Sequence, residues 1–415
     1  MNARLLSVLF CTSLMLLLTT GASISAQSPV PPEITELATG NNAFAFDLYH
    51  TIAAENEGNL FYSPLSISQA LAMTYAGARG TTESEMAQTL HFTLSQAALH
   101  PAFAALNANF EERAQTELVP DDEAQRFQLT IANALWGQAD FPFLPDFVQL
   151  LDKSYGAGLQ LTDFVQAPEA ARDDINQWVE DQTEDKIQDI VPEGAITPDT
   201  RLVLANAIYF HAGWQRTFSE TATEDAPFTL LDGAQVTVPT MRQQEGFLYQ
   251  AGEGYQAVML PYYGGQMGMM IVLPDEGAFE QVEASLTGDS FSAMVAAMSY
   301  QELWLFMPKF EFEFGLELAD TLAAMGMPEA FTDAADFSGM AEEPLFISRI
   351  LHKAFVGVDE NGTEAAAATI VMMEATSAMP SEPLELRLDR PFIFTIYDNV
   401  TGTILFVGRV MNPAQ

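Results

Sequence analysis

The residues of this 415-residue chain that could carry out catalysis are few and scattered. The five histidines are His50, His91, His100, His211 and His352. None of them forms the close pair at helical spacing that a zinc site on a helix needs. No G-x-S-x-G turn and no glycine-rich phosphate loop is present. Carboxylate pairs are too common among 56 acids to indicate a catalytic dyad, although a dyad stays open. The sequence therefore predicts no enzyme, no metal and no cofactor.

The segment 363–375 has a different kind of chemistry, since it alternates like a strand. Its odd positions carry no charge, and its two charges, Glu364 and Glu374, fall on the even positions. Because side chains of a strand alternate between two faces, this segment can enter a sheet with the odd face buried and the even face in water. No proline interrupts it. The alternative is an alanine-rich helix over 364–368, because alanine has the highest helix propensity.

Composition limits the partners of the chain. Hydrophobic residues make up 48% of it, which is enough for a sizeable core, and the net charge is −40. Such a charge repels nucleic acid and anionic membranes. It also argues against a heparin-type cofactor, which needs a basic patch. We interpret the charge itself as a feature of solubility or of adaptation to salt.

The N-terminal residues 1–26 have the features of a secretory signal peptide. Arg4 precedes a mostly apolar run from Leu5 to Leu18, and small residues follow as far as Ala26. The run is shorter than the roughly 20 residues of a membrane span, so we expect export with cleavage after Ala26. Cys11 is the only cysteine, so the mature chain would have no disulfide and no thiolate site.

The elements that would position the segment 363–375 indicate one α+β domain over residues 37–415, after an extended lead-in at 27–36. Ser63-Pro64 is a good helix start, and the apolar residues after it predict a buried helix. Thr82 and Glu85 have capping-box spacing for the next helix. Helices and strands mix without a βαβ rhythm. The predicted strands are 269–273, 303–309, 354–358, 392–397 and 403–407, the last two forming a hairpin.

Five segments resemble the serpin family, in the order and spacing of that family. They are 59–67 with 77–82 (NLFYSPLSI and GARGTT), 206–214 with Phe218 (NAIYFHAGW), 308–340 (PKF through ADFSGM), 352–369 (HKA through DENGTEAAAAT) and 390–394 with 408–413 (RPFIF and GRVMNP). Together they span nearly the whole mature chain. Any one of them alone is weak, but five in order are specific.

The resemblance implies three β-sheets, about nine helices and an exposed reactive loop at about 360–390. In serpins a protease cuts this loop and becomes trapped as an acyl-enzyme while the loop inserts into the main sheet. Family spacing puts the cut at Thr376–Ser377; Met373–Glu374, Ala375–Thr376 and Met379–Pro380 remain alternatives, because the loop is a few residues longer than in antitrypsin-like members. The hinge residues by this match are Glu360, Gly362, Thr363, Glu364, Ala365, Ala366, Ala367, Ala368 and Thr369.

Two more groups of residues match family positions. Ser63, Ser66, Asn206 and His352 match a polar cluster beneath the central strands of the opening sheet, which would gate insertion. Trp214 matches the aromatic residue at the top of that sheet, where the loop enters first. Taken alone, His352 and Trp214 would each be ordinary core residues.

The loop sequence also predicts the class of target. No Lys or Arg lies between Lys353 and Arg387, which argues against a trypsin-like protease because its pocket needs a cation. Small and apolar residues suit elastase-like or subtilisin-like serine proteases, with cysteine proteases as a further class. We expect a secreted, monomeric inhibitor. The alternative within the fold is a non-inhibitory carrier or chaperone.

Overall fold

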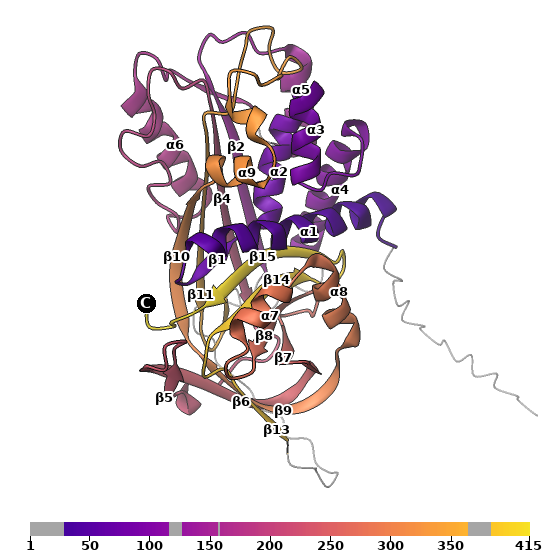
Figure 1. The fold of residues 1–415 in the computed structure, drawn as a ribbon, viewed down its shortest axis with the longest axis vertical. Coiled ribbons are helices and arrows are strands. Elements are labelled where there is room, and N and C mark those ends of the chain that lie inside the picture. Colours follow the sequence, from indigo (N-terminus) through magenta and orange to yellow (C-terminus); the bar gives the residue numbers. More distant parts are fainter. Residues whose placement is uncertain (1–28, 116–126, 157, 364–382) are drawn as a thin grey trace, which may run out of the picture.

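The computed structural model describes residues 29–115, 127–156, 158–363 and 383–415. These residues form nine α-helices and two hydrogen-bonded β-sheets (Figure 1). The mixture of helices with mainly antiparallel strands confirms the α+β class.

The helices are α1 (Pro32–Glu55), α2 (Pro64–Tyr75), α3 (Gly80–Thr89), α4 (Gln96–Gln115), α5 (Pro145–Tyr155), α6 (Pro168–Gln182), α7 (Phe279–Ser285), α8 (Gly288–Ala297), α9 (Ala319–Met325) and the 3₁₀ turns η2 (Glu220–Ala222) and η3 (Pro328–Phe331). The strands are β1 (Leu60–Tyr62), β2 (Gln128–Gln138), β3 (Gln160–Thr162), β4 (Leu202–Gly213), β5 (Glu224–Thr229), β6 (Gln235–Gly252), β7 (Tyr255–Pro261), β8 (Met267–Pro274), β9 (Ser299–Pro308), β10 (Phe310–Glu317), β11 (Arg349–Val358), β12 (Gly362–Thr363), β13 (Leu384–Arg387), β14 (Phe392–Asp398) and β15 (Thr403–Val410). All five predicted strands and the hairpin are confirmed.

The six-stranded sheet has the order β10-β11-β12-β4-β2-β3. Its central strands β11 and β4 are parallel and also pair directly with each other, whereas β2 runs antiparallel to β4. Helices α2 and α6 lie on opposite sides of β2 and β4 (Figure 1). On β4 the side chains of Leu204 and Ile208 join the main core, and those of Ala205 and Ala207 join a second core beneath α6. Both faces of this sheet are therefore covered in its central part.

The nine-stranded sheet has the order β1-β15-β14-β8-β7-β6-β9-β13, with β5 paired to β6. Strand β6 is 18 residues long. It pairs with β9 along Thr240–Tyr249 and with β7 along Leu248–Gly252. The resemblance implies three sheets, but the described residues form two, because β6 pairs with β9 along one part of its length and with β7 along another and so joins the two sets of strands into one sheet.

Helix α2 forms as its sequence predicts. The hydroxyl of Ser63 accepts a hydrogen bond of 3.1 Å from the N–H of Ser66, and Pro64 occupies the first helical position. All twelve residues of α2 are buried, which confirms the prediction of a buried helix.

Two local predictions are wrong. Helix α3 begins at Gly80, and Thr82 does not cap it, because its hydroxyl donates to Glu329 at 2.9 Å and accepts from the N–H of Asp336 at 2.9 Å. The lead-in 27–36 is not extended throughout, since α1 begins at Pro32. A proline at the first helical position has a backbone angle suited to a helix and loses no hydrogen bond there.

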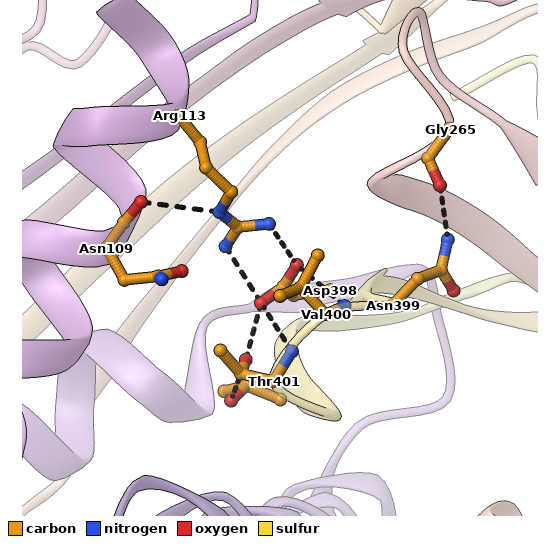
Figure 2. A network of polar contacts seen from close by, with 8 residues as sticks. Asn109, Arg113, Gly265, Asp398, Asn399, Val400 and Thr401 are labelled. Carbon is orange, nitrogen blue, oxygen red and sulfur yellow. Dashed lines mark hydrogen bonds and ion pairs between the residues drawn. The ribbon is translucent and has the colours of Figure 1, made fainter. Parts of the chain in front are cut away.

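A buried ion pair joins the end of α4 to the β14–β15 turn (Figure 2). The guanidinium of Arg113 donates to both carboxylate oxygens of Asp398, at 2.7 and 2.9 Å. Asp398 also accepts from the hydroxyl and the N–H of Thr401 and from the N–H of Val400. Because Asp398 is fully buried and each of its carboxylate oxygens has hydrogen-bond partners, this network connects α4 rigidly to the nine-stranded sheet.

Candidate functional site

A row of three buried polar residues crosses the centre of the six-stranded sheet. Asn133 on β2 is paired in register with Asn206 on β4, and Asn206 is paired with His352 on β11. The amide of Asn206 donates to Asn133, and the ring of His352 is hydrogen-bonded to the Oδ1 of Asn206. The row therefore links the three strands through side chains as well as through their backbones.

The beginning of α2 lies against this row. The hydroxyl of Ser66 accepts from Asn206 at 2.6 Å and donates to Asn133 at 2.9 Å. The N–H of Ser63 donates to Nε2 of His352 at 3.2 Å, and its hydroxyl donates to the carbonyl of Leu405 at 2.7 Å. The structure thus brings together all four residues of the predicted gating cluster. Their gating role stays a prediction.

The proton of His352 can be assigned from these bonds. Since Nε2 accepts from a backbone N–H, Nδ1 carries the proton and donates it to Asn206. Burial lowers the pKa of His352 to about 3, against a smaller opposing effect of the Asn206 backbone. The ring is therefore neutral at ordinary pH, and the row contains no charge.

Sequence reasoning missed Asn133. A signal exists, because this asparagine interrupts the apolar stretch 131–136 at a position that faces the same side as Leu135. A single polar residue in a strand is usually read as an exposed position. Only its register with Asn206 assigns it to the row.

The beginning of the predicted hinge already lies inside the sheet. The two residues of β12, Gly362 and Thr363, pair with Gly213 and Ala212 of β4 on one side, and Thr363 pairs with Val358 of β11 on the other. Thr363 is buried, and its hydroxyl is 2.6 Å from the hydroxyl of Tyr262. A side chain at position 362 would collide with the carbonyl of Ala212, so glycine is needed there.

Glu360 anchors the chain just before β12. Its carboxylate accepts from Lys309 at 2.7 Å and from the hydroxyl of Thr223 at 2.6 Å, and its carbonyl accepts from the N–H of Phe218. Burial alone would raise the pKa of Glu360, but the hydrogen bonds from Lys309 and Thr223 outweigh it, and the pKa lies below its ordinary value. Glu360 therefore stays ionised, and its contacts hold the chain just before β12 in place.

Trp214 lies at the same end of the sheet. Its ring stacks on Tyr262 with centroids 4.7 Å apart, and its indole N–H donates to the carbonyl of Asp359 at 2.9 Å. Its backbone N–H donates to the carbonyl of Asn361 at 2.7 Å. Trp214 thus contacts the turn that leads into β12, where the resemblance places the entry point.

The remaining predicted site residues lie outside the described residues. They are Glu364, Ala365, Ala366, Ala367, Ala368, Thr369, Thr376 and Ser377. Within the described ranges there is no group of three or more His, Cys, Asp or Glu side chains that could hold a metal ion, and no helix is long and apolar enough to cross a membrane.

Comparison with known proteins gives a consistent result. The model of the family described as Serpin (serine protease inhibitor) matches residues 39–413. An uncharacterized serpin-like protein of Thermococcus kodakarensis is 41% identical over 90% of this chain and 84% of its own length. The leukocyte elastase inhibitor of Sus scrofa is 38% identical over 91% of this chain and its full length. Among solved structures, human thyroxine-binding globulin complexed with thyroxine is 31% identical, with a TM-score of 0.81 over 92% of this chain and 99% of that one.

Proposed function

The chain belongs to the serpin family, and from this premise we propose that it is an exported, single-use inhibitor of serine proteases. A protease would cut the loop near Thr376–Ser377, and the cleaved loop would then insert between β4 and β11 while the acyl-enzyme is trapped. The protein would act as a suicide substrate of the protease and not as an enzyme.

The observation that carries this proposal is the position of β12. Its two residues already lie between β11 and β4, antiparallel to both. Beyond β12 these strands pair directly through six residue pairs, from Arg349–Val203 to Ala354–Ile208. An inserted strand would replace this one parallel ladder with two antiparallel ladders. The gain in paired backbone groups supports the proposal that insertion lowers the free energy of the protein.

The register of β12 gives the partners of an inserted strand. Thr363 is opposite Ala212 in an antiparallel pair, so each later residue is opposite an earlier residue of β4. Six residues on, Thr369 would lie opposite Asn206, and paired residues share one face of a sheet. The hydroxyl of Thr369 would then offer Asn206 a new hydrogen-bond partner when His352 moves away.

The even positions of the segment fit the other face. The sequence alone predicts that this face stays in water, but α6 covers the corresponding side of β4 at Val203, Ala205 and Ala207. By the same register the uncharged residues Ala368, Ile370 and Met372 would lie opposite these three. The two charges would fall at the ends, Glu364 opposite His211 and Glu374 opposite Arg201. The pattern of apolar middle and acidic ends supports this register.

The neutral polar row supports a gating role. Insertion separates β11 from β4, so it must break the contact between His352 and Asn206. Buried polar groups cost about 1–3 kcal/mol when left without a partner. A neutral pair that can exchange partners therefore sets a barrier to insertion without forbidding it.

The target follows from the loop residues. The absence of Lys and Arg between Lys353 and Arg387 favours elastase-like or subtilisin-like proteases over trypsin-like ones. The likeness to a leukocyte elastase inhibitor supports the elastase-like class. Cysteine proteases are a further class. Export is supported by the composition of residues 1–26, and we propose a monomer that binds no nucleic acid, membrane or heparin-type cofactor.

A non-inhibitory carrier is the second candidate. The likeness to a thyroxine-binding globulin favours it. The uncharged odd positions of 363–375 speak against it, because a carrier has no need to keep that face free of charge.

The test is to mix the mature protein with an elastase and with a subtilisin and to examine the products on a denaturing gel. We expect a detergent-resistant band near the summed mass. Ala365→Arg, a charge on the buried face, should be cut without forming that band. Ser381→Arg is the matched control, because it lies on the far side of the cut and does not insert. Clean cleavage of the unaltered protein with no such band would favour the carrier.

A further inference from the structure

The outer face of β9 carries three aromatic side chains, Tyr300, Trp304 and Phe306, which we call the aromatic stripe. The alternate residues of β9, such as Leu303 and Leu305, point into the core and are fully buried. Tyr300 is 70% exposed and Trp304 is 37% exposed. Leu248 of β6, the register partner of Tyr300, is 46% exposed. Large apolar side chains gathered on one exposed face are typical of an interaction surface.

The aromatic stripe is held in position by its surroundings. The ring of Tyr300 lies across Gly246, and a Cβ at that position would collide with the phenol. Trp304 and Phe306 stack with ring centroids 6.3 Å apart, and the guanidinium of Arg387 lies 3.7 Å from the centroid of Phe306. Aromatic and arginine side chains fixed in this way are the residue types that contribute most to protein interfaces.

The location of the aromatic stripe relates it to the loop. Strand β13 lies beside β9, with Glu385 paired to Trp304 (Figure 1). The described chain resumes at Pro383. Ser377 is six residues earlier, so at about 3.4 Å per residue the proposed cut lies within about 20–25 Å of Pro383. A protease of about 230 residues has a radius of gyration of about 17 Å, so its body is large enough to reach the surface around β13 while it holds the cut site.

We propose that the aromatic stripe is a docking surface for the body of the protease that cuts the loop, a proposal that rests on the proposed function. It would add contact outside the active-site cleft of the protease. Neighbouring arginines are neutralised locally, since Arg387 is paired with Glu385 and Arg242 with Glu224. The stripe is thus an aromatic area on a chain of net charge −40. Exposed Glu302 lies between Tyr300 and Trp304 on the same face.

The chemistry of the partner face follows from these groups. Aromatic faces attract Lys and Arg side chains, and Glu302 adds a negative charge between two of the rings. The face of the protease that fits would therefore offer apolar side chains together with a Lys or Arg, next to its active-site cleft.

The experiment compares the rate at which elastase cuts the loop in the unaltered full chain and in Y300S/W304S. The rate of release of the C-terminal fragment reports docking whether or not the protease is trapped, and the covalent band separately reports trapping. We expect the second-order rate constant for cleavage to fall at least tenfold. L161S is the matched control, because Leu161 is 55% exposed on β3 in the other sheet. It should leave the rate unchanged, and thermal unfolding checks that each variant is folded.

Each outcome separates the two proposals. An unchanged cleavage rate in Y300S/W304S, with trapping intact, overturns docking and leaves the proposed function standing. Slower cleavage of Y300S/W304S, with no covalent band in any variant, supports docking and contradicts the proposed inhibitor function. A dimer of the unaltered chain that Y300S/W304S abolishes would show that a second copy occupies the stripe, which also overturns the proposal. If no protease cuts the loop, both the docking proposal and the proposed inhibitor function are overturned.

Discussion

Two buried polar groups hold the molecule together in different ways. The row of Asn133, Asn206 and His352 crosses strands of the six-stranded sheet and contains only neutral side chains. The pair of Arg113 and Asp398 joins α4 to the nine-stranded sheet through two charges (Figure 2). A neutral hydrogen bond can exchange one partner for another at low cost, whereas separating a buried ion pair leaves an uncompensated charge. The six-stranded sheet, which is proposed to open, is therefore crossed by neutral hydrogen bonds that can exchange partners. The contact between α4 and the nine-stranded sheet, which is not proposed to open, is an ion pair.

The largest expected effect comes from breaking the ionic joint. Arg113→Met leaves Asp398 buried without its partner, and we expect the free energy of unfolding to fall by about 3–5 kcal/mol. Urea unfolding followed by circular dichroism measures it. The control is Arg242→Met, which removes an exposed ion pair with Glu224 and should cost less than about 1 kcal/mol. Equal losses of unfolding free energy in Arg113→Met and Arg242→Met would contradict the expectation that burial makes the Arg113–Asp398 pair more important for stability.

The neutral row should respond differently to the loss of one member. His352→Ala removes the acceptor of the Ser63 N–H and the partner of Asn206, so the native state should lose about 1–3 kcal/mol. Spontaneous conversion to a latent or polymeric form should also become faster, which native gels of heated samples can follow. His100→Ala is the matched control, because His100 is equally buried but lies on α4, hydrogen-bonded to Tyr155. Unchanged conversion kinetics in His352→Ala would count against gating.

The neutrality of the row can be tested by pH. The folded chain keeps His352 unprotonated down to about pH 3, because burial lowers its pKa, whereas the unfolded chain binds a proton near pH 6.5. The unfolded state thus binds more protons between these values, and stability falls as the pH falls. The slope is about 1.4 kcal/mol per pH unit for each such histidine.

His100, whose burial lowers its pKa to about 4, should contribute a similar slope over a narrower range. His352→Gln should therefore reduce the loss of stability between pH 6 and pH 4 without abolishing it. Unfolding midpoints measured across this range provide the test. An identical pH dependence in the variant and the unaltered protein would mean that His352 is protonated when folded.

The smallest expected effect tests whether Thr369 replaces His352 as the hydrogen-bond partner of Asn206 after insertion. Thr369→Val removes the hydroxyl that the register places opposite Asn206 after insertion. We expect no change in the uncleaved protein, but a loss of about 1 kcal/mol in the stability of the loop-cleaved form. Ser381→Ala, beyond the cut, is the control. A loss of the same size in the uncleaved protein would mean that Thr369 acts elsewhere.

Local patterns in the sequence were sufficient for several elements. The Ser63-Pro64 start and the apolar run after it predicted α2, and the apolar runs at 269–273 and 392–397 predicted β8 and β14. The capping box at Thr82 was wrong because distant residues, Glu329 and Asp336, use its hydroxyl instead. Local signals fail where a side chain has a partner far along the chain.

The sequence by itself determined the family, the alternation of 363–375 and the four residues of the gating cluster, since these depend on residue types at short spacing or on a family match. Only the tertiary structure decided that Asn133 completes the row, that α6 covers one side of β4, and that Arg113 meets Asp398. Each of these depends on strand register or helix packing between segments tens to hundreds of residues apart. Such contacts form because chain folding brings their backbones together, and no local pattern specifies them.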